Sequence, residues 1–411
     1  MSEDRYVVWC FRSSIIPNHE VKKCLKLMVR EKRFWLCNKR LQHREWNILL
    51  KVLKETDDLE SLNLSYANLQ QQKSFKALGT LLRSPYLDLV WLNLSGIDFH
   101  DKGSCLLSSI SAPRYLEDLH LSGCNLHDND LEKILSSEPN KKLKNLDMSS
   151  NKIEGKKDIL QKLLQSFEIM KELDLSWNNI NWSNTQQLAC SLAVNESLFT
   201  LNLSFNGLSD EGALEMTFVL QKNTTLKVLD LSENRISNRG AEFLANGLSI
   251  NTSLKSLNLS GNMMTAQGMQ CILVGAITSR SLQELHMKQI SPDVLCKKAI
   301  DHLKANDVIL SFGVPTLAKS TSTSVREVFV REQIFSEIRN FLTKERLRVL
   351  DLFKMWDKKK NGEISLDNLM MGLESVNIPV TKAILEKIFG ILDKDNNTSL
   401  TYSEFARISK I

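Results

Sequence analysis

A chain of 411 residues is too long for one ordinary compact core and suits two domains or a repeat array with an appendage. Hydrophobic residues make up 42% and charged residues 25%, a balance typical of folded, soluble proteins, which argues against a disordered chain. The net charge of +5 resides in residues 1–58, which hold 13 Lys and Arg against 8 Asp and Glu, so the rest of the chain is neutral.

The N-terminal segment, residues 1–30, is basic and is predicted to form a helical cap. Its longest apolar stretch, Tyr6 to Phe11, is far below the ~20 residues that span a bilayer, so we expect no membrane span. Lysines and arginines lie close to Phe34 and Trp35, a combination seen in nucleic-acid binding. Their helical spacing before the first repeat favours a solvated cap instead, and we expect no nucleic-acid partner.

Residues 31–310 repeat the pattern LxxLxLxxNxL with a period of 27 to 30 residues. The first positions are Leu59, Leu89, Leu116, Leu143, Met170, Leu198, Leu226, Leu254 and Leu282. A degenerate copy precedes them, with Phe34, Leu36 and Leu41 in the apolar slots. Alternation in LxL predicts a short strand, and the Asn slot is expected to bond the backbone of adjacent coils. Apolar spacing after each turn predicts one helix per repeat, as in Ala213, Met216 and Leu220.

The period, the glycine at each helix start and the asparagine after each helix resemble the ribonuclease-inhibitor type of leucine-rich repeat. The residues that carry this resemblance are Gly212, Gly240, Gly268, Asn195, Asn223 and Asn251. It implies an α/β solenoid, a horseshoe with a parallel sheet inside and helices outside, which binds proteins on its concave face. The eight cysteines form no CxxC pair, so we expect free thiols, no zinc site and a cytoplasmic location.

Residues 311–332 are predicted to be a linker, and residues 333–411 to be an all-α EF-hand pair. Two 12-residue loops begin at Asp357 and Asp393, a spacing usual for paired EF-hands. Ile364 and Leu400 occupy loop position 8, where paired loops join by a short β-bridge. These loops resemble those of EF-hand proteins. Together with the repeats they resemble the leucine-rich repeat-containing protein 74 type.

The two loops differ in their oxygen donors, so we predict that calcium binds, if at all, to the second loop only. The first loop has Lys359 at position 3 and Asn368 at position 12, where calcium sites have a ligand and a bidentate Glu. Thr398 occupies position 6 of the second loop, which normally holds Gly. A purely structural EF-hand pair is the alternative. The predicted metal ligands are Asp393, Asp395, Asn397, Ser399, Thr401 and Glu404.

Outward strand positions and turn edges supply a candidate partner-binding surface. The predicted contact residues are Trp91, Asp118, His120, Asp147, Glu172, Asp174, Trp177, Asn202, Phe205 and Asp230. Their acidity predicts a basic or mixed-charge protein partner, and tryptophan is enriched at interface hot spots. The alternative for Trp177 and Phe205 is that they only pack across neighbouring turns.

No phosphate-binding loop, HExxH motif or GxSxG elbow is present. We therefore expect a non-enzymatic interaction scaffold. A GTPase-activating protein of the Ran-activator type, built on the same repeats, is the alternative from another class. The oligomeric state is left open by the sequence.

Overall fold

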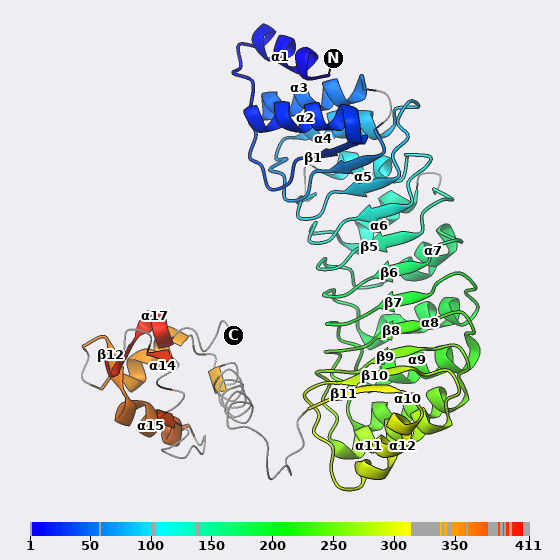
Figure 1. Ribbon diagram of the computed structural model, residues 1–411, viewed down its shortest axis with the longest axis vertical. Helices are drawn as coiled ribbons and strands as arrows, with labels where there is room; N and C mark the ends of the chain where they lie inside the picture. Colours follow the sequence, from blue (N-terminus) through cyan, green and yellow to red (C-terminus); the bar gives the residue numbers. More distant parts are fainter. Residues whose placement is uncertain are drawn as a thin grey trace. The chain divides into compact units, whose positions relative to one another are not determined.

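The chain divides into two compact units, Met1–Thr316 and Leu317–Ile411 (Figure 1). The computed structural model describes residues 2–56, 59–99, 103–136, 140–313, 338, 341–342, 347, 349–358, 361–376, 385–386, 389, 392–393 and 397–405.

In the described part of the first unit, an 11-stranded sheet runs in sequence order, with every strand parallel to its neighbours. The strands are β1 Arg33–Trp35, β2 Ser61–Asn63, β3 Trp91–Asn93, β4 Asp118–His120, β5 Asn145–Asp147, β6 Glu172–Asp174, β7 Thr200–Asn202, β8 Val228–Asp230, β9 Ser256–Asn258, β10 Glu284–Met287 and β11 Ile309–Phe312. The predicted boundary at residue 310 was therefore wrong. Ser311 and Phe312, expected in the linker, pair with His286 and Met287 of β10.

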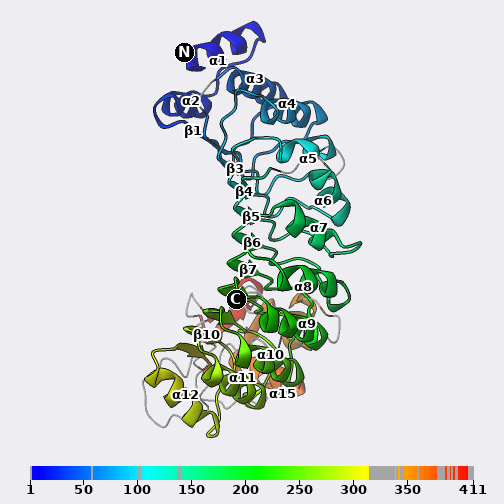
Figure 2. The same ribbon diagram turned by 90° about the vertical axis from the view of Figure 1, so that its right-hand side faces the viewer.

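Helices cover the other side of this sheet, and the strands line the concave side of the unit (Figure 2). The helices are α1 Ser2–Arg12, α2 His19–Glu31, α3 His43–Lys54, α4 Gln72–Leu82, α5 Ser104–Ile110, α6 Asp128–Leu135, α7 Ile159–Ser166, η1 Trp182–Asn184, α8 Thr185–Ala193, α9 Ser209–Lys222, α10 Asn238–Ile250, α11 Ala266–Thr278 and α12 Cys296–Ala305. The predicted leucine-rich-repeat solenoid is confirmed.

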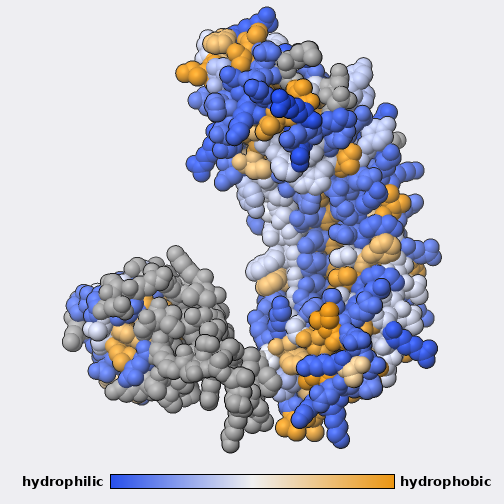
Figure 3. Space-filling model, viewed as in Figure 1, coloured by the Kyte–Doolittle hydropathy of each residue, from blue (hydrophilic) through white to orange (hydrophobic). Residues whose placement is uncertain are grey.

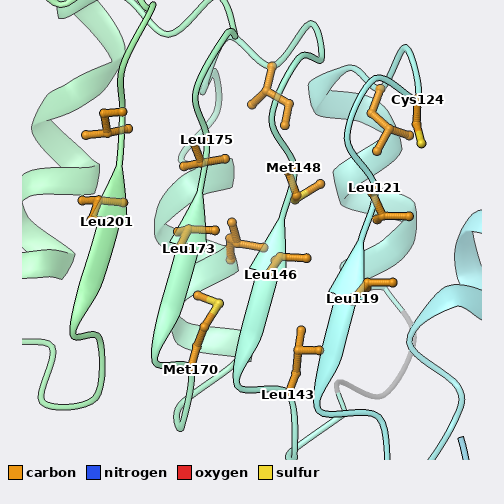
Figure 4. Packing of buried hydrophobic residues seen from close by; sticks show 14 of the residues in the cluster. Leu119, Leu121, Cys124, Leu143, Leu146, Met148, Met170, Leu173, Leu175 and Leu201 are labelled. Atoms are coloured by element: carbon orange, nitrogen blue, oxygen red, sulfur yellow. The ribbon is translucent and has the colours of Figure 1, made fainter. Parts of the chain in front are cut away.

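Aliphatic side chains fill the space between the sheet and the helices. Leu173 and Leu201, at the centres of their strands, are buried and point toward the helices (Figure 4). Met148 and Leu175, two residues after the central leucines of their strands, are buried in the same layer. Because alternate strand residues point to opposite faces, the residues between them are left facing the concave side.

The asparagine slot bonds the backbone of adjacent coils, as the pattern predicted. Asn206 donates through Nδ2 to Leu175 O at 3.0 Å and Leu203 O at 3.1 Å. Its Oδ1 accepts from Ile180 N at 3.0 Å. These bonds satisfy buried backbone groups at the turn, which would otherwise cost about 1–3 kcal/mol each.

Helix starts are linked from repeat to repeat, which explains the recurring glycine. The Asp210 carboxylate accepts hydrogen bonds from Ser237 N at 2.7 Å and Gly240 N at 3.0 Å. A Cβ at Gly240 would lie 2.5 Å from Asp210 Oδ1, so only glycine permits this approach. Asn238 bonds Gly268 N one repeat later, at 3.1 Å.

The N-terminal helices pack onto the first repeat. Tyr6, Val21 and Leu25 are fully buried in the same core as Phe34 of β1. The Asn18 side chain caps α2 by accepting from the Glu20 and Val21 backbone N–H groups. Such hydrogen bonds occupy N–H groups that have no partner within a helix.

The second unit contains α14 Val349–Trp356, β12 Glu363–Ser365, α15 Leu366–Ser375, β13 Ser399–Thr401 and α17 Tyr402–Phe405. Strands β12 and β13 are antiparallel, and Ile364 pairs with Leu400 as predicted. Both side chains are fully buried, together with Phe405. The two loops are thus joined at Ile364 and Leu400, which belong to the larger buried apolar cluster of this unit.

All eight cysteines are free thiols. Of the helices that the structure describes, none is both long and apolar enough to cross a membrane.

Candidate functional site

A row of polar side chains crosses the concave side of consecutive strands. Asp147 of β5 is in register with Asp174 of β6, which is in register with Asn202 of β7 and then Asp230 of β8. His120 of β4 precedes them in the same row. The row also continues past Asp230, to polar residues of β9, β10 and β11.

Neutral donors on neighbouring strands hold these carboxylates in place. Asp174 accepts from Asn202 Nδ2 at 2.9 Å, and Asp230 accepts from Asn258 Nδ2 at 2.7 Å. Asn145 donates a short hydrogen bond to Asp118. Over the described residues, no lysine or arginine forms an ion pair with Asp118, Asp147, Asp174 or Asp230. The carboxylates are therefore ordered without a lysine or arginine partner in the described part of the chain, and Asp147 has His120 beside it.

The surroundings of Asp147 shift its pKa. Burial acts to raise its pKa, but the contact with His120 and the hydrogen bonds from Ser149 outweigh burial and lower the pKa below its ordinary value. His120 Nδ1 lies 3.7 Å from Asp147 Oδ2. Asp147 is thus ionised over a wider pH range than a free aspartate.

A lysine row lies before these strands and was missed by sequence reasoning. It consists of Lys144, Lys171, Lys227 and Lys255, each one residue before its strand. Lys144 pairs with Glu117 at 2.7 Å, and Lys171 lies 4.5 Å from the ring centre of Phe199. The recurrence of lysine at one position of the repeat was the available signal. The surface therefore carries both signs of charge.

Aromatic residues gather at the N-terminal strands of the same face. Trp91 lies 6.2 Å from Trp35 and 5.2 Å from His120, measured between ring centres. Arg33 lies over the Trp35 ring at 5.2 Å. Trp91 and His120 were predicted contact residues, and the structure brings them together. Trp35 joins them although it was not among the predicted contact residues.

Trp177 and Phe205 lie at the turn edge of the sheet, one repeat apart. Their rings are stacked at 3.9 Å with an interplanar angle of 10°. They remain 57% and 37% exposed, respectively. Packing across neighbouring turns, the alternative considered for them, therefore occurs, and it leaves both rings open to solvent. Glu172, the remaining predicted contact residue on β6, is exposed.

Three polar residues at β10 and β11 have the types found in serine hydrolases. His286 Nδ1 lies 2.7 Å from Ser311 Oγ, and His286 Nε2 lies 3.6 Å from Glu284. Ser256 donates to the same Glu284 carboxylate at 3.0 Å. These residues lie along regular sheet rather than on a strained turn, and an oxyanion site requires donors aimed at a reacting carbonyl. The arrangement extends the polar row of the concave side.

In the first EF-hand loop, the backbone frame is present but ligands are missing. Asp357 accepts from Asn361 N at 3.3 Å and from Gly362 N at 2.8 Å. Gly362 has a φ of 82°. Asn368 at position 12 offers an amide in place of a bidentate carboxylate, so this loop does not fit calcium.

The second loop has the same frame with a fuller donor set. Asp393 accepts from Asn397 N at 3.1 Å and Thr398 N at 3.0 Å, and Thr398 has the expected positive φ, 65°. Glu404 accepts from Thr401 N at 3.0 Å. Asp393 and Glu404 are each only 5% exposed.

Buried carboxylates with further oxygen donors fit a hard divalent cation, which would be held by Asp393, Asn397, Ser399, Thr401 and Glu404. Within the described residues, no three carboxylate, imidazole or thiol groups form a metal-binding cluster. Asp395, the remaining predicted ligand, lies outside the described residues.

Family models match both parts of the chain. The leucine-rich-repeat model matches residues 112–135, 170–181, 194–216, 222–245 and 251–273. The EF-hand domain pair model matches residues 342–410. The chain therefore contains leucine-rich repeats, followed by an EF-hand pair. The resemblance to the leucine-rich repeat-containing protein 74 type stays a prediction.

Individual relatives are distant. Calcium-dependent protein kinase 21 of Oryza sativa subsp. japonica is 28% identical over 123 residues, which is 29% of this chain and 22% of that protein. An internalin from Listeria monocytogenes is 16% identical, with a TM-score of 0.40, over 77% of this chain and 95% of that chain. Actin-binding site 2 of leiomodin-1 is 22% identical, with a TM-score of 0.24, over 33% of this chain and 80% of that chain.

Proposed function

We propose that this protein is a non-catalytic scaffold whose concave sheet binds a protein partner with a basic or mixed-charge surface. The observation that carries this proposal is the row of ordered carboxylates, without lysine or arginine partners among the described residues, beside exposed aromatic rings. Electrostatic complementarity selects partners and speeds their association. The lysine row before the same strands favours a partner of mixed charge.

Reversing the charge of the carboxylate row tests this proposal. A triple variant, Asp147→Lys, Asp174→Lys and Asp230→Lys, should lose partners that the wild-type chain captures in affinity purification with mass spectrometry. A matched variant, Glu168→Lys, Glu196→Lys and Glu242→Lys, makes the same change in net charge at positions outside the strands and should retain them. Capture that survives the triple change with the fold intact would contradict the proposal.

The non-catalytic part of the proposal has its own tests. Hydrolysis of an ester substrate that disappears in the Ser311→Ala variant would show that the His286–Ser311 contact is catalytic. Faster GTP hydrolysis by small GTPases in the presence of this chain would favour the Ran-activator type of function. We expect neither.

We propose further that the second EF-hand loop binds one calcium ion and thereby modulates the scaffold. Calorimetry on the full chain should give a single site with a dissociation constant of about 10⁻⁵ M or weaker. Glu404→Gln should remove the binding heat, because it replaces a buried carboxylate ligand. Asp357→Asn in the first loop is the matched control and should barely change it. Two bound ions would contradict this assignment, and no heat would favour a purely structural pair.

The free thiols support a reducing compartment, and we propose a cytoplasmic location. Microscopy of the tagged chain would test it.

A further inference from the structure

One turn position has left-handed backbone in successive repeats. We call it the rim position, and it directly precedes the asparagine slot. Its φ lies between 53° and 71° at Tyr66, Gly96, Gly123, Ser150, Trp177, Phe205, Glu233 and Gly261. Glycine adopts this conformation without steric cost, whereas a residue with a Cβ pays for it. Trp177 and Phe205 therefore occupy positions that backbone preference alone would give to glycine.

Burial does not explain these two aromatic residues. Phe205 covers one face of the Trp177 ring, and Trp177 remains 57% exposed. The rim neighbour on the other side of Trp177 is Ser150, which is small and exposed. Phe205 thus backs the indole on one side, and the opposite side has no bulky rim residue beside it.

The two strands that lead to Ser150 and Trp177 each carry a carboxylate on the concave side. Asp174 lies three residues before Trp177, and Asp147 lies three residues before Ser150, so both carboxylates come from the two strands that lead to these rim positions. Neither carboxylate has a lysine or arginine partner among the described residues. Rim residues from Gly123 to Gly261 include no cation. The lysine row lies at the opposite ends of these strands.

We infer that the open side of Trp177 is a docking point for an arginine side chain of the protein partner. The guanidinium would stack on the indole over Ser150 and direct its N–H groups toward Asp147 and Asp174. This inference rests on the proposed function and specifies the chemistry recognised there. Arginine is favoured over lysine because its planar head both stacks on aromatic rings and bonds carboxylates with two parallel hydrogen bonds.

Fluorescence anisotropy with two labelled probe peptides tests this preference on the full chain. One peptide alternates glycine with arginine, and the other alternates glycine with lysine at the same length and charge. The arginine peptide should bind about two- to fivefold more tightly, the range of an exposed cation–π contact. Trp177→Gly should reduce the ratio of the two affinities to about one.

The Trp177→Gly change is compatible with folding, because glycine suits a φ of 53° and the indole is largely exposed. Its melting temperature should stay within about 3 °C of the wild type. Tyr66→Gly is the matched control. Tyr66 has the same backbone conformation and is 64% exposed, but the strand residues in the corresponding positions are Asn63 of its own strand and Trp35 of the preceding strand, and neither is charged. The Tyr66→Gly variant should still bind the arginine peptide more tightly than the lysine peptide.

Equal affinities for the two peptides, or a preference that survives Trp177→Gly, would overturn the inference. A different result tests the proposed scaffold function. Partner capture that is lost in the Asp147, Asp174 and Asp230 triple variant, together with equal affinities for the two peptides, would overturn the arginine docking point alone.

Discussion

At the scale of single residues, the second EF-hand loop contains a conflict between backbone and side chain. Thr398 has a φ of 65° where the first loop has Gly362 at 82°. A β-branched residue is disfavoured in this region. The sequence predicted this conflict, because the loop position alone specifies the required φ.

Thr398→Gly should strengthen calcium binding about fivefold, since relief of left-handed strain amounts to roughly 1 kcal/mol. Thr398→Ala keeps the Cβ and should gain less. Calorimetric titration of the two variants against wild type measures the difference. Equal gains in both variants would attribute the effect to the lost hydroxyl and methyl groups instead of to backbone conformation.

His120→Ala should raise the pKa of Asp147, because the histidine contact helps to lower it. In the wild type the folded pKa lies below the ordinary value. Ionised Asp147 therefore stabilises the fold above the unfolded pKa, and this contribution is lost as the pH falls through the folded pKa. In the variant the contribution is smaller and is completely lost at a higher pH, because the folded pKa is higher. Carboxyl NMR titration measures it, and His286→Ala, on a distant strand, should leave the Asp147 pKa unchanged.

Residue roles were predictable where the repeat dictates them. The bonds of Asn206 follow from the slot it occupies, as does the outward position of Asp174. The contact between Trp35 and Trp91 was not predicted, because the first repeat is degenerate and Trp35 was considered only as a neighbour of the basic residues before it. The hydrogen bonds between Asn202 and Asp174 depend on rotamers, which a sequence pattern does not specify.

At the scale of elements, the spacing of the outer helices depends on small residues. A Cβ at Gly275 of α11 would lie 2.6 Å from Ala245 O and 2.9 Å from Ala245 Cα, both backbone atoms of α10. Gly247 is similarly close to the backbone of α9 at Thr217. Sequence reasoning identified the apolar faces of these helices but not these glycines, because closeness of approach is a property of two helices together.

Gly275→Ala should lower the free energy of unfolding by about 2 kcal/mol, within the range for overpacking. The backbone at Ala245 must move, because the atoms at the contact are backbone atoms and not the end of a flexible side chain. Gly207→Ala is the control, because its Cβ would meet nothing nearer than 3.7 Å. Urea denaturation compares the two, and similar losses in both variants would show that the tight contact relaxes without cost.

At the scale of the whole molecule, the unit that holds the repeats is a linear stack in which each coil contacts its neighbours. Stability in such arrays is transmitted from coil to coil. The solenoid, the EF-hand pair and their order along the chain were predictable from periodicity and loop spacing. The extent of the sheet was not, since β11 lacks the repeat consensus and forms by pairing with β10.

Leu25→Ala in α2 should open a cavity at the N-terminal end and cost about 2–4 kcal/mol. Amide hydrogen exchange should then accelerate in β1 to β3 while β7 to β9 stay protected. Leu27→Ala on the same helix is the control, because Leu27 is 44% exposed. A uniform loss of protection along the array would mean that the coils unfold as one cooperative block.

Because the strands pair without stagger, equivalent residues repeat at a constant spacing along the concave side. Equivalent residues recur at about 4.8 Å, whereas the turns of an α-helix recur at about 5.4 Å and same-face residues of an extended peptide at about 6.8 Å. A helix laid along the row therefore drifts by about half a period after four turns, and a strand drifts sooner. The side chains of a helical or extended partner can therefore stay aligned with equivalent residues of only about four consecutive coils. The stretch from Asp147 to Asp230 is four coils long.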